Sequence, residues 1–252
     1  MRGKVYLVGV GPGDPELLTI KALNIIKSVD VVMYDRLVCD EILNLIPEST
    51  MKLFSGKDHS GNSEMQQDEI NHNMARFAIH GLSVARLKSG DPFLFGRGAE
   101  EIEYLKGVGI ECEIIPGLTS AIGIPTSIGL PLTHRNYSSQ ILIISGHLKN
   151  GNSQKWENIA EFSGTIVILM GANSVGDISE KLIKYGKSPE TPVCIIQNGT
   201  QKTQRIITDN LRNITAKSRS EGLQPPALIV IGEVVKLRNH IQIKLEQARE
   251  RV

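Results

Sequence analysis

Four short loops rich in small residues follow apolar runs of the chain, and they are the segments best suited to chemistry. They occupy residues 9–14, 87–98, 115–121 and 169–172. Glycine allows positive φ angles and close approach of a ligand to the backbone, whose N–H and C=O groups then face that ligand. Because open α/β sheets bind ligands at the carboxyl ends of their strands, the four loops together predict a ligand-binding site.

The spacing of the first loop excludes two common nucleotide-binding patterns. The dinucleotide pattern G-x-G-x-x-G needs its third glycine where this chain has Asp14. The phosphate-loop pattern fails around Gly56 and Lys57, because Met51 stands in place of its first glycine and Asp58 in place of its Ser or Thr. A plain connecting turn is the alternative interpretation of the first loop.

The composition of the chain limits its partners and its environment. A length of 252 residues, 40% of them hydrophobic, allows one large domain or two ordinary ones. The 28 Lys and Arg residues balance the 27 Asp and Glu residues, so we expect neither nucleic acid nor a membrane as a partner. The three cysteines include no C-x-x-C pair, which favours reduced thiols in a cytoplasmic protein without a metal site. No apolar run approaches the roughly 20 residues of a membrane span.

Strands and helices alternate along the sequence, which predicts an α/β fold. In the first half, we expect strands at 4–10, 30–34, 83–87 and 112–115 and helices at 16–28, 64–80 and 97–107. In the second half, we expect strands at 140–145, 165–170, 192–197 and 227–231, a further strand within 201–208, and helices at 174–185 and 233–250. Asp14 is expected to cap the first helix, whose first turn holds Pro15 and Glu16. The alternation of strands and helices is interrupted near 134–137, which predicts two domains, 1–133 and 138–252.

Seven motifs, in order along the chain, carry a resemblance to a known family. They lie at residues 5–22, 34–38, 56–57, 66–71, 90–98, 129–135 and 225–235. Over nearly its whole length the chain resembles the tetrapyrrole methylase family, and residues 93–98 and 131–135 are closest to its uroporphyrinogen-methylating members. The chain differs from Rossmann-type methyltransferases, which carry an acidic residue just before their glycine-rich turn, where Leu7 and Val8 stand here.

The resemblance implies a fold, a cofactor and a set of partners. The fold is that of the class III methyltransferases, with two α/β domains, a mixed sheet flanked by helices in each, and a cleft for cofactor and substrate between them. The cofactor is S-adenosyl-L-methionine, which leaves as S-adenosyl-L-homocysteine, and no metal is implied. The partners are a small-molecule tetrapyrrole substrate and a second copy of the chain in a homodimer.

The cofactor contacts that the resemblance implies fall in the four loops and in one later turn. They are Pro12, Ser89, Gly90, Asp91, Leu94, Thr119, Ser120, Met170 and Gly199. Ser89 departs from the glycine often found at its position in the family, and its hydroxymethyl group could crowd the cofactor. Asp91 precedes a proline, and its alternative role is to cap the next element of the loop.

The resemblance also assigns acid–base roles to Asp35 and Lys57. The alternatives are an ion pair with Arg36 or a helix cap for Asp35, and a carboxylate anchor for Lys57. Because the substrate carries several carboxylates and guanidinium groups bind carboxylates in a bidentate manner, Arg36, Arg97 and Arg135 are the candidate substrate contacts. Each of these arginines has a structural ion pair as its alternative role.

The expected reaction is C-methylation of uroporphyrinogen III on rings A and B, at positions 2 and 7, giving precorrin-2 through precorrin-1. Alignment of nucleophile, methyl group and leaving sulfur is expected to supply much of the rate. Two alternatives are a methylase that acts later in corrin synthesis and a non-catalytic module that binds tetrapyrroles.

Overall fold

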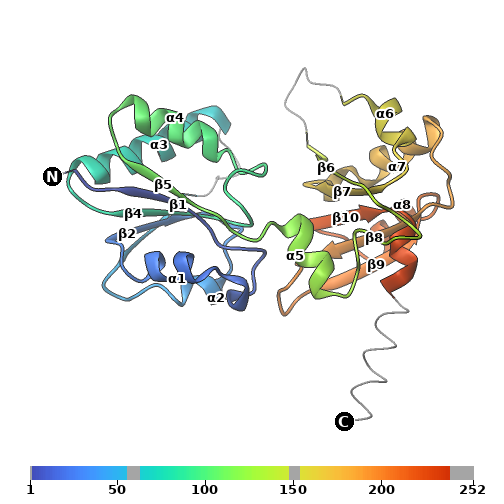
Figure 1. Ribbon diagram of the computed structural model, residues 1–252, viewed down its shortest axis with the longest axis horizontal. Helices are drawn as coiled ribbons and strands as arrows, with labels where there is room; N and C mark the ends of the chain where they lie inside the picture. The colour runs from blue at the N-terminus through green and yellow to red at the C-terminus, as the bar shows by residue number, and fades with distance from the viewer. Residues whose placement is uncertain (1, 56–62, 148–153, 239–252) are drawn as a thin grey trace, which may run out of the picture. The chain divides into compact units, whose positions relative to one another are not determined.

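The computed structural model describes residues 2–55, 63–147 and 154–238, which fall into two units, Met1–Ser120 and Ala121–Val252. Each unit contains one five-stranded sheet with helices packed on it, which confirms the predicted α/β class (Figure 1). The predicted domain boundary near 134–137 lies inside the second unit. Two contacts hold the preceding segment there, because Ile124 lies against Gly199 and Thr165 Oγ1 donates a 2.7 Å hydrogen bond to the carbonyl of Leu132.

The sheet of the first unit is built from parallel strand pairs in the order β3-β2-β4-β1-β5. Its strands are β1 (Val5–Gly9), β2 (Val31–Tyr34), β3 (Met51–Phe54), β4 (Val84–Lys88) and β5 (Cys112–Ile115). Four of them match the strands predicted from the sequence. The fifth, β3, was not predicted, because it is an edge strand whose residues are largely exposed and lack the apolar run of a buried strand.

Helices cover both faces of this sheet, and the side chains of the strands alternate between two apolar cores. The helices are α1 (Ile20–Ile26), α2 (Asp40–Leu43), α3 (Ser63–Ile79) and α4 (Gly98–Gly107). Val5 and Leu7 pack into the core that contains residues of α3 and α4. Val8 packs into the opposite core, with residues of α1 and α2. Helices α1 and α2 therefore lie on one face and α3 and α4 on the other, as Figure 1 shows.

The predicted first helix, at 16–28, is two separate elements. Asp14 caps a short 3-10 helix, η1 (Pro15–Leu17), by accepting a 2.9 Å hydrogen bond from the backbone N–H of Glu16. Helix α1 begins only at Ile20, where the hydroxyl of Thr19 accepts a 3.1 Å bond from the N–H of Ala22. The second cap separates the two elements, because an N-cap residue has extended backbone angles that interrupt a continuous helix.

The sheet of the second unit is mixed, with strand order β6-β7-β10-β8-β9. Its strands are β6 (Ile141–Ser145), β7 (Thr165–Leu169), β8 (Pro192–Gln197), β9 (Arg205–Asn210) and β10 (Ala227–Ile231). Strand β10 runs antiparallel to β7 and β8, and β9 is the further strand expected after the turn at 198–199. Helices α6 (Trp156–Glu161), α7 (Val175–Lys184) and α8 (Ile214–Ser220) contribute to a single apolar core on one face.

Three further helical elements belong to the second unit, apart from Ser120, which is the last residue of the first unit. They are α5 (Ser120–Ser127), η2 (Ala172–Ser174) and η3 (Glu233–Lys236). A helix is predicted at 233–250, but the chain forms a 3-10 helix at its start, and residues 239–252 lie outside the described part of the chain. Within the described ranges, none of the helices combines the length and the apolar character that crossing a bilayer requires.

A carboxylate joins β2 to β4 at the amino-terminal edge of the first sheet. Asp30 Oδ2 accepts bonds from the hydroxyl and the N–H of Ser83, at 2.6 and 2.8 Å, which hold the pKa of Asp30 below its ordinary value. Because the folded pKa lies below the unfolded one, the contact stabilises the fold near neutral pH, and this stabilisation is lost as the pH falls through the folded pKa.

Ser83→Ala is expected to lower the free energy of unfolding at pH 7 by about 1 kcal/mol or less, since the carboxylate is exposed. The difference from the wild type should shrink below about pH 4, as Asp30 becomes protonated. Urea denaturation at pH 7 and below about pH 4 measures the difference in the free energy of unfolding. The exposed Ser28, whose hydroxyl donates a 3.2 Å bond to the nearby carbonyl of Ile25, provides the control Ser28→Ala. An equal loss at both pH values would contradict the role of Asp30.

Candidate active site

Three of the four predicted loops meet at the carboxyl edge of the first sheet. They follow β1, β4 and β5, which are neighbours in the sheet and run in the same direction. Gly90 N–H donates a 2.7 Å bond to the carbonyl of Gly11, and Gly11 N–H donates a 3.2 Å bond in return, which makes an isolated antiparallel bridge. A Cβ at Gly117 would lie 2.2 Å from the carbonyl oxygen of Gly90. The three loops are therefore in direct backbone contact.

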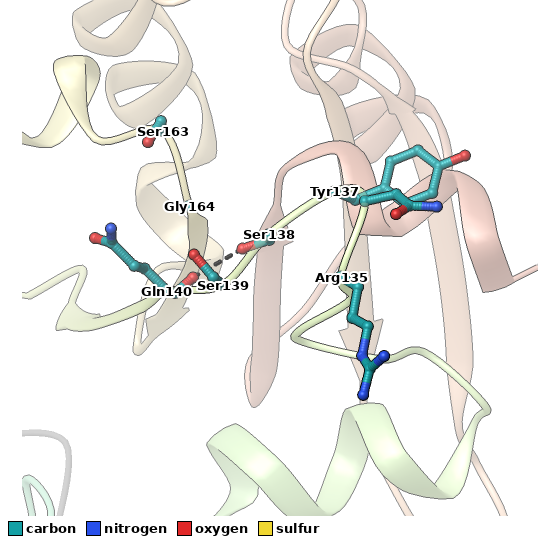
Figure 2. Close-up of a pocket in the computed structure, with 8 residues that line it drawn as sticks. Arg135, Tyr137, Ser138, Ser139, Gln140, Ser163 and Gly164 are labelled. Atoms are coloured by element: carbon teal, nitrogen blue, oxygen red, sulfur yellow. Dashed lines mark hydrogen bonds between the residues drawn. The ribbon is translucent and has the colours of Figure 1, made fainter.

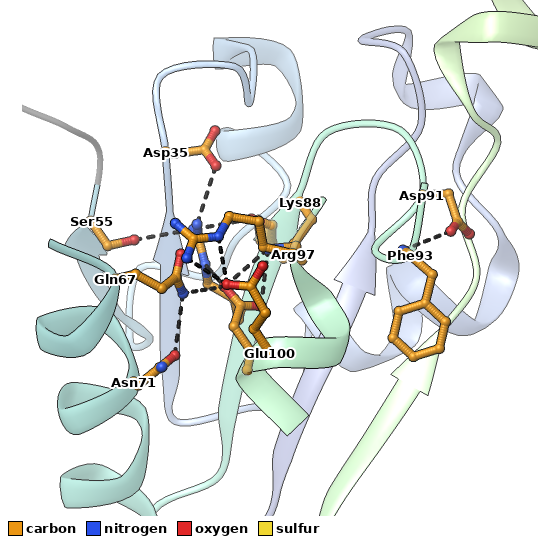
Figure 3. A network of polar contacts seen from close by, with 12 residues as sticks. Asp35, Ser55, Gln67, Asn71, Lys88, Asp91, Phe93, Arg97 and Glu100 are labelled. Atoms are coloured by element: carbon orange, nitrogen blue, oxygen red, sulfur yellow. Dashed lines mark hydrogen bonds and ion pairs between the residues drawn. The ribbon is translucent and has the colours of Figure 1, made fainter. Parts of the chain in front are cut away.

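Asp91 connects two of these loops through its carboxylate. Its Oδ1 accepts bonds from the N–H groups of Phe93 and Leu94, at 2.9 and 3.3 Å, and its Oδ2 accepts a 3.3 Å bond from the N–H of Gly117. Figure 3 shows the bond to Phe93. These bonds are the capping role that was the alternative for Asp91, and they order the backbone around which the other predicted contacts lie.

Seven of the predicted cofactor contacts lie on these three loops at one edge of the first unit. They are Pro12, Ser89, Gly90, Asp91, Leu94, Thr119 and Ser120. At this edge, the helices that follow two neighbouring strands lie on opposite faces of the sheet. Helix α1 follows β1 and packs on one face, and α4 follows β4 and packs on the other. In open α/β sheets, neighbouring strands whose chains leave toward opposite faces mark the preferred site of ligand binding.

The remaining two predicted cofactor contacts lie together on the second sheet. Met170 follows β7 and Gly199 follows β8, and both strands run antiparallel to β10 between them, so the two residues share one edge. Met170 is half exposed and has a φ of 57°. A Cβ at Gly199 would lie 2.5 Å from the side chain of Ile124. Glycine at this turn is therefore required by packing within the second unit.

A buried cluster of charged residues lies beneath β4, on the face covered by α3 and α4 (Figure 3). Glu101, on α4, is fully buried and accepts bonds from Lys88 Nζ at 3.0 and 2.9 Å. It also accepts a 3.1 Å bond from Gln67 Nε2, and its Oε1 lies 3.7 Å from Arg86 Nε. Burial lowers the pKa of Lys88, and the neighbouring Arg86 acts in the same direction, whereas Glu101 opposes it.

Asp35, a predicted catalytic residue, is the partly exposed end of this cluster. It follows β2, and its Oδ2 accepts a 3.2 Å bond from Arg86 Nη2. Its Oδ1 accepts a 3.0 Å bond from the N–H of Leu37. An ion pair was one alternative role for Asp35, with Arg36 as its partner, but the partner is Arg86. Lys57, the other predicted catalytic residue, lies outside the described residues.

The three candidate substrate arginines have different surroundings. Arg36 is exposed after β2, next to Asp35. Arg97 is half-buried at the start of α4, and its Nε donates a 2.8 Å bond to Glu100, which is the ion pair given as its alternative role. Arg135 is exposed and lines an open depression of about 290 Å³ in the second unit, together with Tyr137 and neighbouring polar residues (Figure 2).

The sequence reasoning missed the buried cluster, although β4 carries a signal for it. Arg86 and Lys88 alternate with apolar residues on a strand that is central in the sheet, so both point to the same covered face. Buried cations require buried carboxylates or other partners. This requirement could have directed attention to Glu101, which lies on the next helix.

The family model described as tetrapyrrole (corrin/porphyrin) methylases matches residues 4–215. The chain belongs to the tetrapyrrole methylase family. This membership confirms the predicted family and the predicted methyltransferase class.

Relatives within the tetrapyrrole methylase family cover nearly all of the chain. An S-adenosyl-L-methionine-dependent uroporphyrinogen III methyltransferase from Methanosarcina barkeri is 46% identical over 240 residues, which span 94% of each protein. Siroheme synthase 2 from Cronobacter sakazakii is also 46% identical over 240 residues, but the match spans 95% of this chain and only 52% of that protein. The chain therefore corresponds to about half of the siroheme synthase.

Solved structures of family members support the fold. The uroporphyrin-III C-methyltransferase from Thermus thermophilus complexed with S-adenyl homocysteine is 38% identical, with a TM-score of 0.79 over 93% of this chain and 100% of that one. A cobalt precorrin-4 methyltransferase is 25% identical, with a TM-score of 0.82 over 92% of this chain and 95% of that one. The predicted class III methyltransferase fold is confirmed.

Proposed function

We propose that this chain is an S-adenosyl-L-methionine-dependent uroporphyrinogen-III C-methyltransferase. Its products would be precorrin-1 and then precorrin-2, methylated at position 2 on ring A and position 7 on ring B. The observation that carries the proposal is the meeting of the loops after β1, β4 and β5 in direct backbone contact at one edge of the first sheet. The relatives from Methanosarcina barkeri and Thermus thermophilus support the choice of cofactor and substrate.

The residues at this edge fit the proposed cofactor. Ser89, Thr119 and Ser120 bring hydroxyl groups, and Leu94 and Pro12 bring apolar surface. A nucleoside needs such a site, which is mostly apolar with a few converging hydrogen-bonding groups. When bound, S-adenosyl-L-methionine supplies an activated methyl group. We assign the loops the task of fixing the direction of transfer, since alignment contributes much of the rate of such a reaction.

We assign the acid–base role to Asp35 and carboxylate binding to the three arginines. Methylation forms a carbon–carbon bond to the macrocycle and breaks the carbon–sulfur bond, and the macrocycle then loses a proton. Asp35 lies at the same edge of the sheet as the loops and is partly exposed, and both observations support its role as the acceptor of that proton. Arg36, Arg97 and Arg135 would hold the carboxylates of the substrate. The homodimer and the cytoplasmic location stay predictions.

Arg97→Ala is expected to raise the KM for uroporphyrinogen III by about 10-fold and to change the KM for S-adenosyl-L-methionine by less than about 2-fold. The reason is that a lost guanidinium removes binding to a substrate carboxylate but no contact to the cofactor. Steady-state kinetics with each substrate varied in turn measures both constants. An equal rise in both would indicate that Arg97 only orders its loop through Glu100.

Mass spectrometry of the product tests the proposed function. Purified protein is incubated with S-adenosyl-L-methionine and freshly generated uroporphyrinogen III, and the expected product carries two added methyl groups. Turnover of a methylated precorrin alone would instead indicate a later-step enzyme, in line with the cobalt precorrin-4 methyltransferase among the structural relatives. Tetrapyrrole binding without methyl gain from any of these substrates would indicate a non-catalytic module.

A further inference from the structure

We infer that Arg86 is a positioning residue that holds the carboxylate of Asp35 in its working orientation. The inference rests on the proposed function, and it assigns a task to a buried residue that lies outside the seven sequence motifs.

The guanidinium of Arg86 joins the carboxyl ends of β2, β3 and β4. Its Nη2 donates a 3.2 Å bond to Asp35, which follows β2. Its Nη1 donates a 3.1 Å bond to the hydroxyl of Ser55, which follows β3, and a 3.2 Å bond to the carbonyl of Leu87 within β4. Ser55 is itself held by the carbonyl of Tyr34, to which its N–H donates at 2.7 Å. A planar guanidinium with several fixed partners has little freedom to rotate.

The burial of the cluster restricts Arg86 further. The side chains of Arg86, Lys88 and Glu101 are 5%, 7% and 0% exposed, whereas that of Asp35 is 27% exposed. Among these four charged side chains, two are cationic and two are anionic, and the balance is complete only with Asp35 included. An unpaired buried charge is costly. Loss of the ion pair with Asp35 would therefore raise the free energy of the folded state.

Asp35 depends on Arg86 for its orientation in turn. Its Oδ1 is fixed by a local bond from the N–H of Leu37, two residues away, and its Oδ2 is fixed by Arg86. Removal of the second bond leaves the carboxylate free to rotate away from the edge. A displacement of about 1 Å of a group that takes part in the reaction can cost about 100-fold in rate.

A double-mutant cycle on methyl transfer tests the inference, with Arg86→Gln and Asp35→Asn as its two changes. In the wild-type background, Arg86→Gln is expected to lower kcat by about 100-fold and to change the KM for S-adenosyl-L-methionine by less than about 2-fold. In the Asp35→Asn background, the same change should lower kcat by less than about 3-fold, because no carboxylate is left to position. Arg86→Lys keeps the charge and should restore part of the lost kcat.

Lys88→Gln is the matched control, because Lys88 lies two residues along the same strand, on the same face, and forms an ion pair with the same Glu101. Its effect on kcat should be the same in both backgrounds. If Arg86→Gln does not fold, as judged by circular dichroism, Arg86→Lys replaces it in the cycle, and a smaller effect in the Asp35→Asn background again supports the inference.

The outcomes separate the inference from the proposed function. Equal effects of the Arg86 change in both backgrounds, in a wild-type enzyme that methylates uroporphyrinogen III, overturn the inference and leave the function standing. Absence of methyl transfer by the wild type overturns the function, and the inference falls with it.

Discussion

Glu101→Gln is expected to lower the free energy of unfolding by about 3–5 kcal/mol, which is a large part of the total stability of a typical domain. The carboxylate is fully buried and bonds Lys88 with both oxygens, and it lies within ion-pair distance of Arg86. A neutral amide at this position leaves two buried cations with only Asp35 to balance them. Removal of one partner from a buried ion pair is costly because the remaining charge stays buried without compensation.

Urea denaturation followed by far-UV circular dichroism measures this loss. Glu103→Gln is the control, since Glu103 lies exposed on the same helix two residues further on. We expect that change to alter the free energy of unfolding by less than about 0.5 kcal/mol. A loss below about 1 kcal/mol for Glu101→Gln would mean that the buried cations do not depend on this carboxylate.

Gly117→Ala is expected to weaken the binding of S-adenosyl-L-homocysteine by at least about 100-fold, or about 2.7 kcal/mol. A Cβ at this position would lie 2.2 Å from the carbonyl oxygen of Gly90 and 2.6 Å from the carbonyl carbon of Gly9. Both neighbours are backbone atoms, so no side chain can rotate away and the loops must separate. The bond from the N–H of Gly117 to Asp91 would break at the same time.

Isothermal titration calorimetry of the folded variant measures this affinity. Gly107→Ala is the matched control, because a Cβ at Gly107, the last residue of α4, meets nothing within 4 Å. The control should bind the ligand as the wild type does. Unchanged affinity in a folded Gly117→Ala protein would show that the cofactor does not depend on the contact between these loops.

The sequence was sufficient to predict the parts of the fold that rest on local patterns. The apolar runs of β1 and β8 identify buried strands, and the glycines that follow β1 and β4 identify loops of the candidate site. Edge strand β3 escaped prediction because it has only four residues and Lys52 interrupts its apolar run. Helices α2 and α8, of four and seven residues, are too short to show a helical period.

The contacts within the candidate site could not be predicted, because they join residues that are distant in the sequence. Asp35 and Arg86 lie 51 positions apart, and Arg86 bonds Ser55 from a distance of 31 positions. Local reasoning offered Arg36 as the partner of Asp35, since it is the next residue. The partner is Arg86 instead, because β4 pairs with β2 in parallel and Arg86 therefore lies beside the end of β2.

The bridge between Gly11 and Gly90 has a consequence for protein engineering. The two glycines exchange both of their backbone hydrogen bonds, so neither loop can change its path unless the other follows. If the first loop alone were replaced by that of another family member, it would pack against a loop with a different sequence, and the two backbone hydrogen bonds could be lost. Successful chimaeras should therefore exchange the segments around Gly11 and Gly90 together, from the same parent protein.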